Sequence, residues 1–302
     1  MKIVVVGAGA LGAYFGARWQ EAGQDVTFLV RPKRAEQLRR NGLHIYSSHG
    51  DYQLDQLKLA EKVEDIDSAD LVLLAVKGYH LEGTLDSLAA LTAKGAKILP
   101  VLNGIEHISI LQERLGEDAV LGGLSFIIST LDEQGNVVHT SKFHDLILGP
   151  LVSSQKKICE ELADISRAAN FTIKSSSDIE TEMWKKYMFI TAFSGITTAV
   201  NLPIGDIRNH PQTFHIAEQM LKEMKMLANH SQVKLSDDHI NQAVAQLNGL
   251  DGDATSSMHQ DRRKGATLEV EHLHGGALRL ASRQGIDMPY TDSIYGLIKP
   301  FE

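Results

Sequence analysis

The chain opens on the stretch that decides its fold, Met1–Gly12, which reads MKIVVVGAGALG. Its apolar, β-branched residues predict a strand, and the residues that follow have a helical pattern. In the turn between them, three glycines have the G-x-G-x-x-G spacing of a dinucleotide-binding unit. The first permits a tight turn, the second lets a pyrophosphate approach the backbone, and the third lets the helix pack close to the strand. The predicted cofactor-binding residues of this turn are Gly7, Gly9, Ala10, Leu11 and Gly12. A tight turn with a purely structural role is the alternative interpretation.

Beyond this turn, the first half of the chain alternates between strand and helix patterns. The strands are expected at residues 3–6, 25–30, 70–75 and 98–102, and helices at 10–22 and 34–41. Near-continuous apolar strands separated by helices predict a parallel sheet that is covered on both faces. Residues 43–60 have the pattern of a hairpin. Residues 120–149 are expected to form two or three strands around the turn Asp132–Gly135, as an extension of the same sheet.

The second half of the chain has a different texture. Residues 153–169 are helical in pattern, residues 175–178 form a polar break, and almost all of 179–299 is compatible with helix. We therefore expect an α/β fold with a Rossmann-type domain and a mostly parallel sheet over residues 1–174. An all-helical domain that carries substrate-binding and catalytic residues would follow over 175–302. The active site of such a protein is expected in the cleft between the domains.

Composition limits the function classes. The net charge of −8 over 302 residues argues against nucleic acid or an anionic membrane as a partner. Lys2 and the apolar run after it resemble a signal peptide, but the run is short, contains glycines and lacks a cleavage site. No stretch reaches the roughly 18 apolar residues of a membrane span. The single cysteine, Cys159, cannot form an internal disulfide, so we expect a cytoplasmic protein. The 13 histidines form no metal-binding pattern, and no metal is expected.

The residue at the end of the second strand indicates which dinucleotide binds. An NAD-binding unit has a carboxylate there that accepts hydrogen bonds from the ribose hydroxyls. This chain has Arg31 instead. A planar guanidinium can hold a phosphate bidentately, which favours the 2′-phosphate of NADP, with Lys33 or Arg34 assisting. An ordinary surface arginine is the alternative.

Several short motifs that lie far apart in the chain are informative when their order and spacing are considered together. They are Ala75-Val-Lys77, Leu102-Asn103-Gly104, Glu182-Met-Trp184-Lys-Lys186, Ser256-Ser-Met with Asp261, and Thr267-x-Glu269. In this order and spacing the chain resembles, over essentially its whole length, the ketopantoate reductase family, the 2-dehydropantoate 2-reductases of pantothenate biosynthesis. The resemblance implies NADPH-dependent reduction of 2-dehydropantoate to pantoate.

The resemblance also implies a role for individual residues. By its W-x-K motif, Lys186 is the general acid, and Asn103 and Glu269 are catalytic with it. Lys77 and Asn103 contact the cofactor, and Ser257, Ser194 and Asn103 the substrate. Taken singly, these residues have simpler interpretations. Lys186 could be a surface lysine, Ser257 a helix cap, and Glu269 a first-turn residue of a helix that Thr267 caps.

The expected chemistry is consistent with these residue types. Reducing a 2-oxo acid requires a hydride at the carbonyl carbon and a proton at its oxygen, where negative charge develops. An ammonium group such as that of Lys186 can stabilise the charge and donate the proton. The carboxylate of Glu269 can orient this ammonium or a substrate hydroxyl, and the amide of Asn103 offers both a donor and an acceptor.

The chain departs from the family at three positions. Ile190, Ser194 and Ile204 stand where the family typically has asparagines that contact ketopantoate. The substrate pocket is therefore expected to be more apolar. A reductase of another branched 2-oxo acid and a β-hydroxyacid dehydrogenase are the alternative enzymes, and a non-catalytic NADPH-binding sensor is the alternative outside enzymes. A helical second domain with exposed apolar faces would suit a homodimer.

Overall fold

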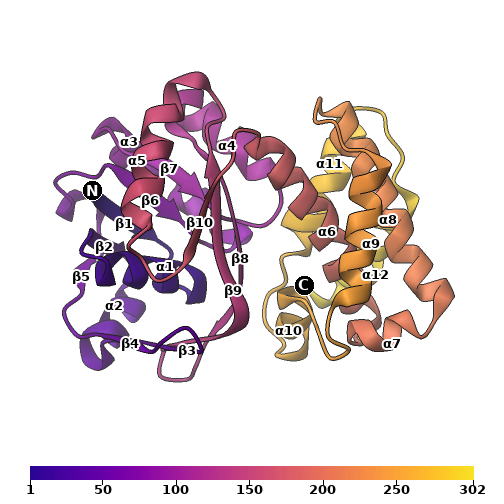
Figure 1. Ribbon diagram of the computed structural model, residues 1–302, viewed down its shortest axis with the longest axis horizontal. Helices are drawn as coiled ribbons and strands as arrows, with labels where there is room; N and C mark the ends of the chain where they lie inside the picture. The colour runs from indigo at the N-terminus through magenta and orange to yellow at the C-terminus, as the bar shows by residue number, and fades with distance from the viewer. The chain divides into compact units, whose positions relative to one another are not determined.

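The structure is a computed structural model that describes all 302 residues. The chain divides into two compact units (Figure 1). The first consists of Met1–Leu102 and His107–Ile179, and the second of Asn103–Glu106 and Glu180–Glu302. The short segment Asn103–Glu106 thus belongs by its contacts to the unit formed mainly by the C-terminal part of the chain.

The first unit contains a five-stranded parallel sheet in the order β5-β2-β1-β6-β7. Its strands are β1 (Lys2–Val6), β2 (Asp25–Leu29), β5 (Lys58–Ala60), β6 (Leu71–Leu74) and β7 (Lys97–Pro100). The central strand pairs Val6 with Leu29 on one side and with Leu74 on the other, so the ends of three strands lie level beside the glycine turn. This sheet and the helical C-terminal region confirm the predicted fold class.

A second sheet corrects the prediction for residues 120–149. They form β8 (Gly122–Leu131) and β9 (Val137–Gly149), a long antiparallel pair. This pair does not extend the parallel sheet as predicted. It belongs to a separate sheet with β3 (Leu43–Ser47), β4 (Tyr52–Leu54) and β10 (Thr172–Ser175). The reason is that β9 pairs in parallel with β3 on one part of its length and with β10 on another, and local periodicity cannot show such distant partners.

The hairpin expected over residues 43–60 is present only in its first part. β3 and β4 pair antiparallel, whereas β5 leaves the hairpin and pairs in parallel with β2 in the first sheet. The segment 43–60 therefore links the two sheets.

The helix after the glycine turn, α1 (Ala10–Glu21), is buried nearly all round. Tyr14, Phe15 and Trp19 are fully buried and belong to one hydrophobic core with residues of both sheets, such as Phe28 and Leu146. Small, aliphatic and aromatic side chains fill this space together. The other helices of this unit are α2 (Pro32–Asn41), α3 (Leu85–Ala93), α4 (Glu106–Leu115, whose first residue is counted with the second unit) and α5 (Lys156–Ser166).

A cluster of aromatic polar side chains lies beside α1. The Tyr14 hydroxyl and His144 Nδ1 are 2.6 Å apart. The ring of His144 lies 4.0 Å from that of His49 and 5.6 Å from that of His139, centroid to centroid. Burial lowers the pKa of His144 to about 4, and the neighbouring His49, His139 and Arg18 add to the effect.

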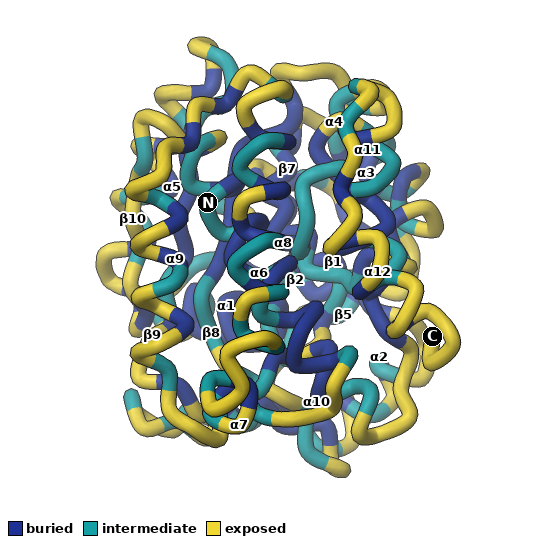
Figure 2. The backbone as a smooth tube through the Cα atoms, turned by 90° about the vertical axis from the view of Figure 1, so that its right-hand side faces the viewer, coloured by how far each residue is buried: buried dark blue, intermediate teal, exposed yellow.

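The second unit is a bundle of helices around its own core. Its elements are α6 (Ile179–Val200), α7 (Ile204–Arg208), α8 (Pro211–His230), α9 (Asp237–Gly249), α10 (Ser257–Arg263), a π-helical turn (Glu271–Gly275), α11 (Gly276–Arg283) and α12 (Pro289–Ile298). Buried and exposed stretches alternate along these helices, as expected of amphipathic helices that share a core (Figure 2).

The remaining helical segments of the chain are single 3-10 turns. They occur at Val63–Asp65, Gly78–His80, Glu82–Thr84, Glu117–Ala119, Ser153–Gln155 and Lys299–Phe301. None of the helices combines the length and apolar composition needed to cross a membrane.

Candidate active site

The glycine turn has the geometry of a phosphate cradle. Gly7 has a φ of +96°, and a Cβ at this position would lie 2.8 Å from the carbonyl oxygen of Ala75. A Cβ on Gly12 would lie 2.2 Å from the carbonyl oxygen of Gly7, so the helix packs directly against the turn. Gly9 is different, because a Cβ there would meet nothing within 4 Å.

The open side of the turn is also electrostatically suited to an anion. α1 begins directly after Gly9, and no side chain caps it. The backbone N–H groups of its first turn, which include those of Ala10 and Leu11, therefore have no intrahelical acceptor. Such a helix N-terminus favours a phosphate group, so the residues present fit the pyrophosphate of a nicotinamide dinucleotide.

The three basic residues expected near the ribose differ in their surroundings. Arg31 is exposed at the start of α2, and no hydrogen bond or ion pair within the chain engages its guanidinium. Arg34 instead donates from Nε to the carbonyl oxygen of Ala8 at 3.1 Å and from Nη1 to Gln37 at 2.6 Å. Burial lowers the pKa of Arg34. Arg34 thus supports the glycine turn, while Arg31 and the exposed Lys33 remain available to a phosphate.

Lys77 follows β6 and is half-buried before the turn Gly78–His80. The pKa of His80 is lowered by burial and by the positive charge of Arg31. His80 and Arg31 therefore interact electrostatically, although they follow different strands of the sheet.

The predicted proton donor lies in the second unit. Lys186 is half-buried in α6, and burial lowers the pKa of its ammonium group to about 8. The negative charge of Glu269 acts in the opposite direction and raises this pKa. The two residues are 83 positions apart in sequence, and the fold brings them into electrostatic contact.

Glu269 is buried and lies where a helix begins. The backbone N–H of Leu273 donates to the carbonyl oxygen of Glu269 at 2.9 Å, and the π-helical turn Glu271–Gly275 follows. The interpretation of Thr267 as the cap of this helix is wrong, because the helix starts at Val270. π-helical turns are rare and occur frequently at functional sites.

The turn that carries Asn103 packs against the same segment. Gly104 has a φ of +86°, and a Cβ there would lie 3.1 Å from the carbonyl oxygen of His272. From α6, the hydroxyl of Tyr187 donates to the carbonyl oxygen of Leu273 at 2.6 Å. Gly104, next to Asn103, therefore packs on the carbonyl group of His272, and Tyr187, next to Lys186, binds that of Leu273. These two carbonyl groups lie three and four residues after Glu269. Asn103 itself is half-buried.

The predicted serines have different roles. Ser256, not Ser257, caps α10, since its Oγ accepts from the backbone N–H of His259 at 3.1 Å. The same Oγ lies 3.2 Å from Oγ1 of Thr197 in α6. Ser257 is exposed as the first residue of α10 and is therefore available to a substrate, whereas Ser194 is only 6% exposed.

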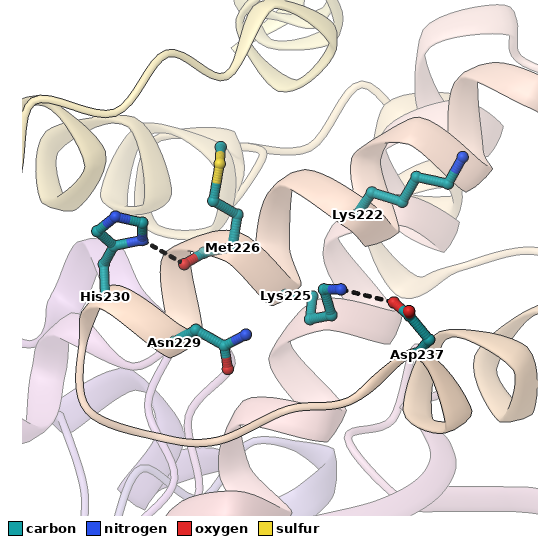
Figure 3. A pocket seen from close by; sticks show the side chains of 6 residues that line it. All are labelled: Lys222, Lys225, Met226, Asn229, His230 and Asp237. Atoms are coloured by element: carbon teal, nitrogen blue, oxygen red, sulfur yellow. Dashed lines mark hydrogen bonds and ion pairs between the residues drawn. The ribbon is translucent and has the colours of Figure 1, made fainter.

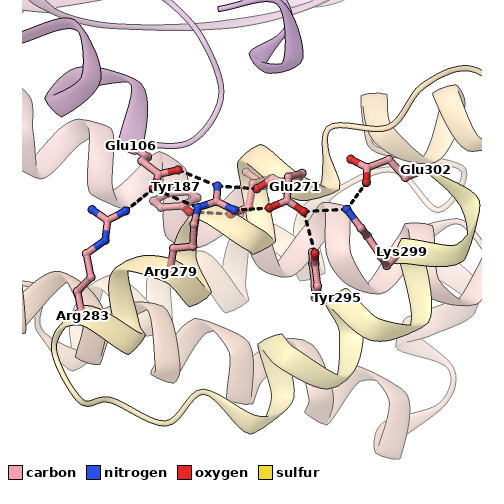
Figure 4. Close-up of polar contacts among 9 residues, drawn as sticks. Glu106, Tyr187, Glu271, Arg279, Arg283, Tyr295, Lys299 and Glu302 are labelled. Atoms are coloured by element: carbon pink, nitrogen blue, oxygen red, sulfur yellow. Dashed lines mark hydrogen bonds and ion pairs between the residues drawn. The ribbon is translucent and has the colours of Figure 1, made fainter. Parts of the chain in front are cut away.

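Sequence reasoning missed a group of charged residues around Glu106. Its carboxylate accepts hydrogen bonds from Arg279 and Arg283, and Arg279 also reaches Glu271 (Figure 4). Tyr187, whose contact with Leu273 is described above, also belongs to this group. No local pattern distinguishes these residues. The only sequence signal for Glu106 is its position three residues after Asn103.

A surface groove of about 430 Å³ lies along α8, and none of the predicted residues lines it (Figure 3). Within it, Lys225 Nζ pairs with Asp237 Oδ1 at 2.6 Å, and the His230 ring bonds to the carbonyl oxygen of Met226 at 2.9 Å. No three His, Cys, Asp or Glu side chains converge in a geometry that could hold a metal ion.

Comparison with known proteins identifies the family. The pattern of "Ketopantoate reductase PanE/ApbA" matches residues 3–153, and that of the C-terminal part of the same family matches residues 178–302. The chain belongs to the ketopantoate reductase family. It is 33% identical to the "Uncharacterized oxidoreductase YkpB" of Bacillus subtilis over 304 residues, which cover 100% of this chain and 99% of the relative.

Solved structures agree with this membership in the ketopantoate reductase family. The crystal structure of 2-dehydropantoate 2-reductase from Geobacter metallireducens has a TM-score of 0.92 and 28% identity, with 100% of both chains covered. A ternary structure of D-mandelate dehydrogenase with NADH and anilino(oxo)acetate has a TM-score of 0.90 over 100% of this chain and 98% of the other. With 22% identity, that likeness shows the fold alone.

The three departures from the ketopantoate reductase pattern differ in their burial. Ile190 is half-buried in α6, four residues after Lys186, and Ser194 follows four residues later. Residues at this spacing lie on one face of a helix. Ile204 is fully buried in the core, and its N–H donates to the carbonyl oxygen of Ala254. Ile190 and Ser194 are therefore the departures that share a helix face with Lys186.

Proposed function

We propose that the protein is an NADPH-dependent 2-dehydropantoate 2-reductase that reduces ketopantoate to pantoate. The observation that carries the proposal is Lys186, a half-buried lysine with a pKa of about 8, in electrostatic contact with Glu269. A general acid is most effective when its pKa lies near the working pH, and a surface lysine would not meet that condition.

The proposed roles divide between the two units. The glycine turn, Lys77 and Arg31 bind the dinucleotide, Arg31 through the 2′-phosphate. NADPH supplies the hydride for the substrate's C2 carbonyl carbon when bound. The Lys186 ammonium donates a hydrogen bond to the carbonyl oxygen and then its proton, which neutralises the charge that develops there.

The remaining residues orient the reacting groups. The Glu269 carboxylate holds the Lys186 ammonium in place and keeps it protonated, because its negative charge favours the cation. Asn103 contacts both substrate and cofactor through its amide. The exposed hydroxyl of Ser257, at the start of α10, binds the substrate, with Ser194 lying on the Lys186 face of α6.

A second candidate is the reduction of another branched 2-oxo acid. It is favoured by Ile190, which places an apolar side chain one helical turn from Lys186, where the sequence resemblance leads us to expect an asparagine. A site that loses hydrogen-bonding groups discriminates less well in favour of a polar substrate.

An assay of NADPH oxidation with a panel of 2-oxo acids tests both candidates. Ketopantoate and branched acids without its hydroxyl should be included. The highest kcat/KM on ketopantoate supports the first candidate, and the highest value on an acid without the hydroxyl supports the second. Binding of NADPH without turnover of any acid would contradict both.

Three features of the biological context follow from this proposal. Pantoate as product places the enzyme in pantothenate biosynthesis, and we expect it in the cytoplasm. The second unit exposes Leu202 and Leu297, 41% and 60% respectively. A homodimer that covers these residues is the expected assembly, which light scattering would test.

A further inference from the structure

Glu106 forms an ion pair whose geometry is more specific than that of ordinary surface pairs. Arg279 donates from Nε to Oε1 at 3.2 Å and from Nη2 to Oε2 at 2.8 Å, so the contact is bidentate. Arg283 adds a bond from Nη2 to Oε1 at 2.8 Å. The Glu106 side chain is only 17% exposed, and the two guanidinium groups hold the pKa of its carboxyl below the usual range against the effect of burial. Bidentate pairs of this kind fix orientation as well as contributing energy.

The pair joins two segments that carry proposed catalytic residues. Glu106 stands three residues after Asn103, and Arg279 stands in α11, ten residues after Glu269. Arg279 also donates from Nη2 to the carbonyl oxygen of Glu271 at 3.1 Å. Figure 4 shows the Arg279 side chain between the carboxylates of Glu106 and Glu271. One guanidinium therefore contacts both the end of the Asn103 turn and the π-helical turn that follows Glu269.

The backbone of the Asn103 turn also contacts the π-helical turn directly. A Cβ on Gly104 would lie 3.1 Å from the carbonyl oxygen of His272, so the turn packs closely on the π-helical segment. The segment Asn103–Glu106 accordingly belongs by contacts to the unit of Lys186 and Glu269. The close packing at Gly104 and the ion pair at Glu106 therefore join the same two segments at two points.

We propose that Glu106 and Arg279 are positioning residues, which hold the Asn103 amide in register with Lys186 and Glu269. The inference rests on the proposed function, because it assigns Asn103 to the reaction. Neither residue touches a reacting group in this scheme. Their effect passes through Asn103, whose misplacement by about 1 Å can lower turnover by up to roughly a hundredfold.

The first test measures the turn itself and needs no substrate. Hydrogen–deuterium exchange of peptides that span residues 103–112 and 269–276 should be faster in Glu106→Gln and Arg279→Lys than in the unsubstituted protein, because their protected amides lie in α4 and in the π-helical turn. Lysine keeps the charge but loses the planar fork, so Arg279→Lys tests geometry rather than charge. Lys299→Met is the matched control, because Lys299 contacts Glu271 at the far end of the same network and not Glu106. Unchanged exchange in both test variants would overturn the proposal whether or not the protein is a reductase.

The second test is a double-mutant cycle in turnover. Arg279→Lys should lower kcat on the preferred 2-oxo acid on the order of tenfold or more. In an Asn103→Ala background the same substitution should have almost no further effect on kcat, because its route of action is already lost. Additive losses in the cycle would show that the pair only supports the fold. An unsubstituted protein without activity on any acid would count against the proposed function, and the exchange result alone would then decide whether the Glu106–Arg279 ion pair holds the Asn103 turn.

Discussion

Lys186 shows how burial changes the acidity of a lysine side chain. Desolvation disfavours the charged ammonium and lowers its pKa to about 8, while Glu269 limits the shift. Lys185, its neighbour in the chain, instead pairs with Glu182 at 3.0 Å on the side of α6. The sequence offers two adjacent lysines, and the difference in environment separates them.

The pH dependence of turnover tests this assignment. The protonated form of Lys186 is the donor, so kcat/KM for reduction should fall as the pH rises through about 8. Glu269→Gln removes the charge that raises this pKa, and the falling limb should move to lower pH. Lys186→Ala should lower kcat by at least about a hundredfold while NADPH still binds, and Lys185→Ala serves as the control. If Lys186→Ala and Lys185→Ala had the same kcat, the general acid would have to be another residue.

Arg31 is a second test at the scale of single residues. Its exposed guanidinium is available to the 2′-phosphate that distinguishes NADPH from NADH. Arg31→Ala should weaken NADPH binding at least about tenfold, since charge-assisted hydrogen bonds contribute about 1.5–3 kcal/mol each, and change NADH binding little. Fluorescence titration with both cofactors measures this. Equal weakening of the two would contradict a role in 2′-phosphate recognition.

At the scale of elements, the strand-turn-helix of the first residues separates structural from binding glycines. Gly12 lies where a side chain would collide with the backbone of Gly7, while the space around Gly9 is open. Gly9 has a φ of −72°, which alanine adopts without strain. The same motif therefore contains two positions that the fold requires, Gly7 and Gly12, and one that only a ligand would require.

Alanine at Gly12 should lower the stability of the protein, whereas alanine at Gly9 should weaken dinucleotide binding. Gly12→Ala should destabilise the protein by about 1–3 kcal/mol, because the strand and α1 must move apart. Gly9→Ala should leave the thermal midpoint almost unchanged and weaken dinucleotide binding, because the methyl group occupies the space that the pyrophosphate approaches. Thermal unfolding and NADPH titration of both variants measure the two effects. Normal NADPH binding by Gly9→Ala would show that the cofactor lies elsewhere.

At the scale of the whole molecule, both units contain buried histidines that resist protonation. Burial lowers the pKa of His144 in the first unit and of His259 and His274 in the second to about 4. The unfolded chain binds these protons near pH 6.5, so it binds more protons than the folded chain between pH 6.5 and 4. The free energy of unfolding should therefore decrease as the pH falls through this range.

Urea denaturation at pH 7.5 and pH 5.5 measures this loss of stability. The free energy of unfolding at pH 7.5 minus that at pH 5.5 should be smaller in His144→Gln and in His259→Gln than in the unsubstituted protein. This holds even where the substitution itself lowers stability. His230→Gln is the control, because His230 is exposed at the end of α8. A difference that stays the same in both buried variants would attribute the acid sensitivity to other groups.

The parallel sheet was predictable because its signals are local. Short apolar strands, helix periods and glycine spacing are properties of neighbouring residues, and they located β1, β2, β6 and β7 within a few positions. The second sheet was not predictable in this way. β9 pairs with β3, which lies far from it in sequence, and with β10, whose four residues Thr172–Ser175 are too short and too polar to indicate a strand.

The features of the candidate site also differ in whether the sequence alone could predict them. The sequence by itself determined the glycine turn, the arginine at the end of the second strand and, through its spaced motifs, the family, because each depends on which residues are present and in what order. Only the tertiary structure decided that Lys186 and Glu269 interact, that Ser256 rather than Ser257 caps α10, and that Glu106 anchors the Asn103 turn to Arg279. Burial, charge proximity and bidentate geometry arise between segments that are distant in the chain, and they exist only once the core has brought those segments together.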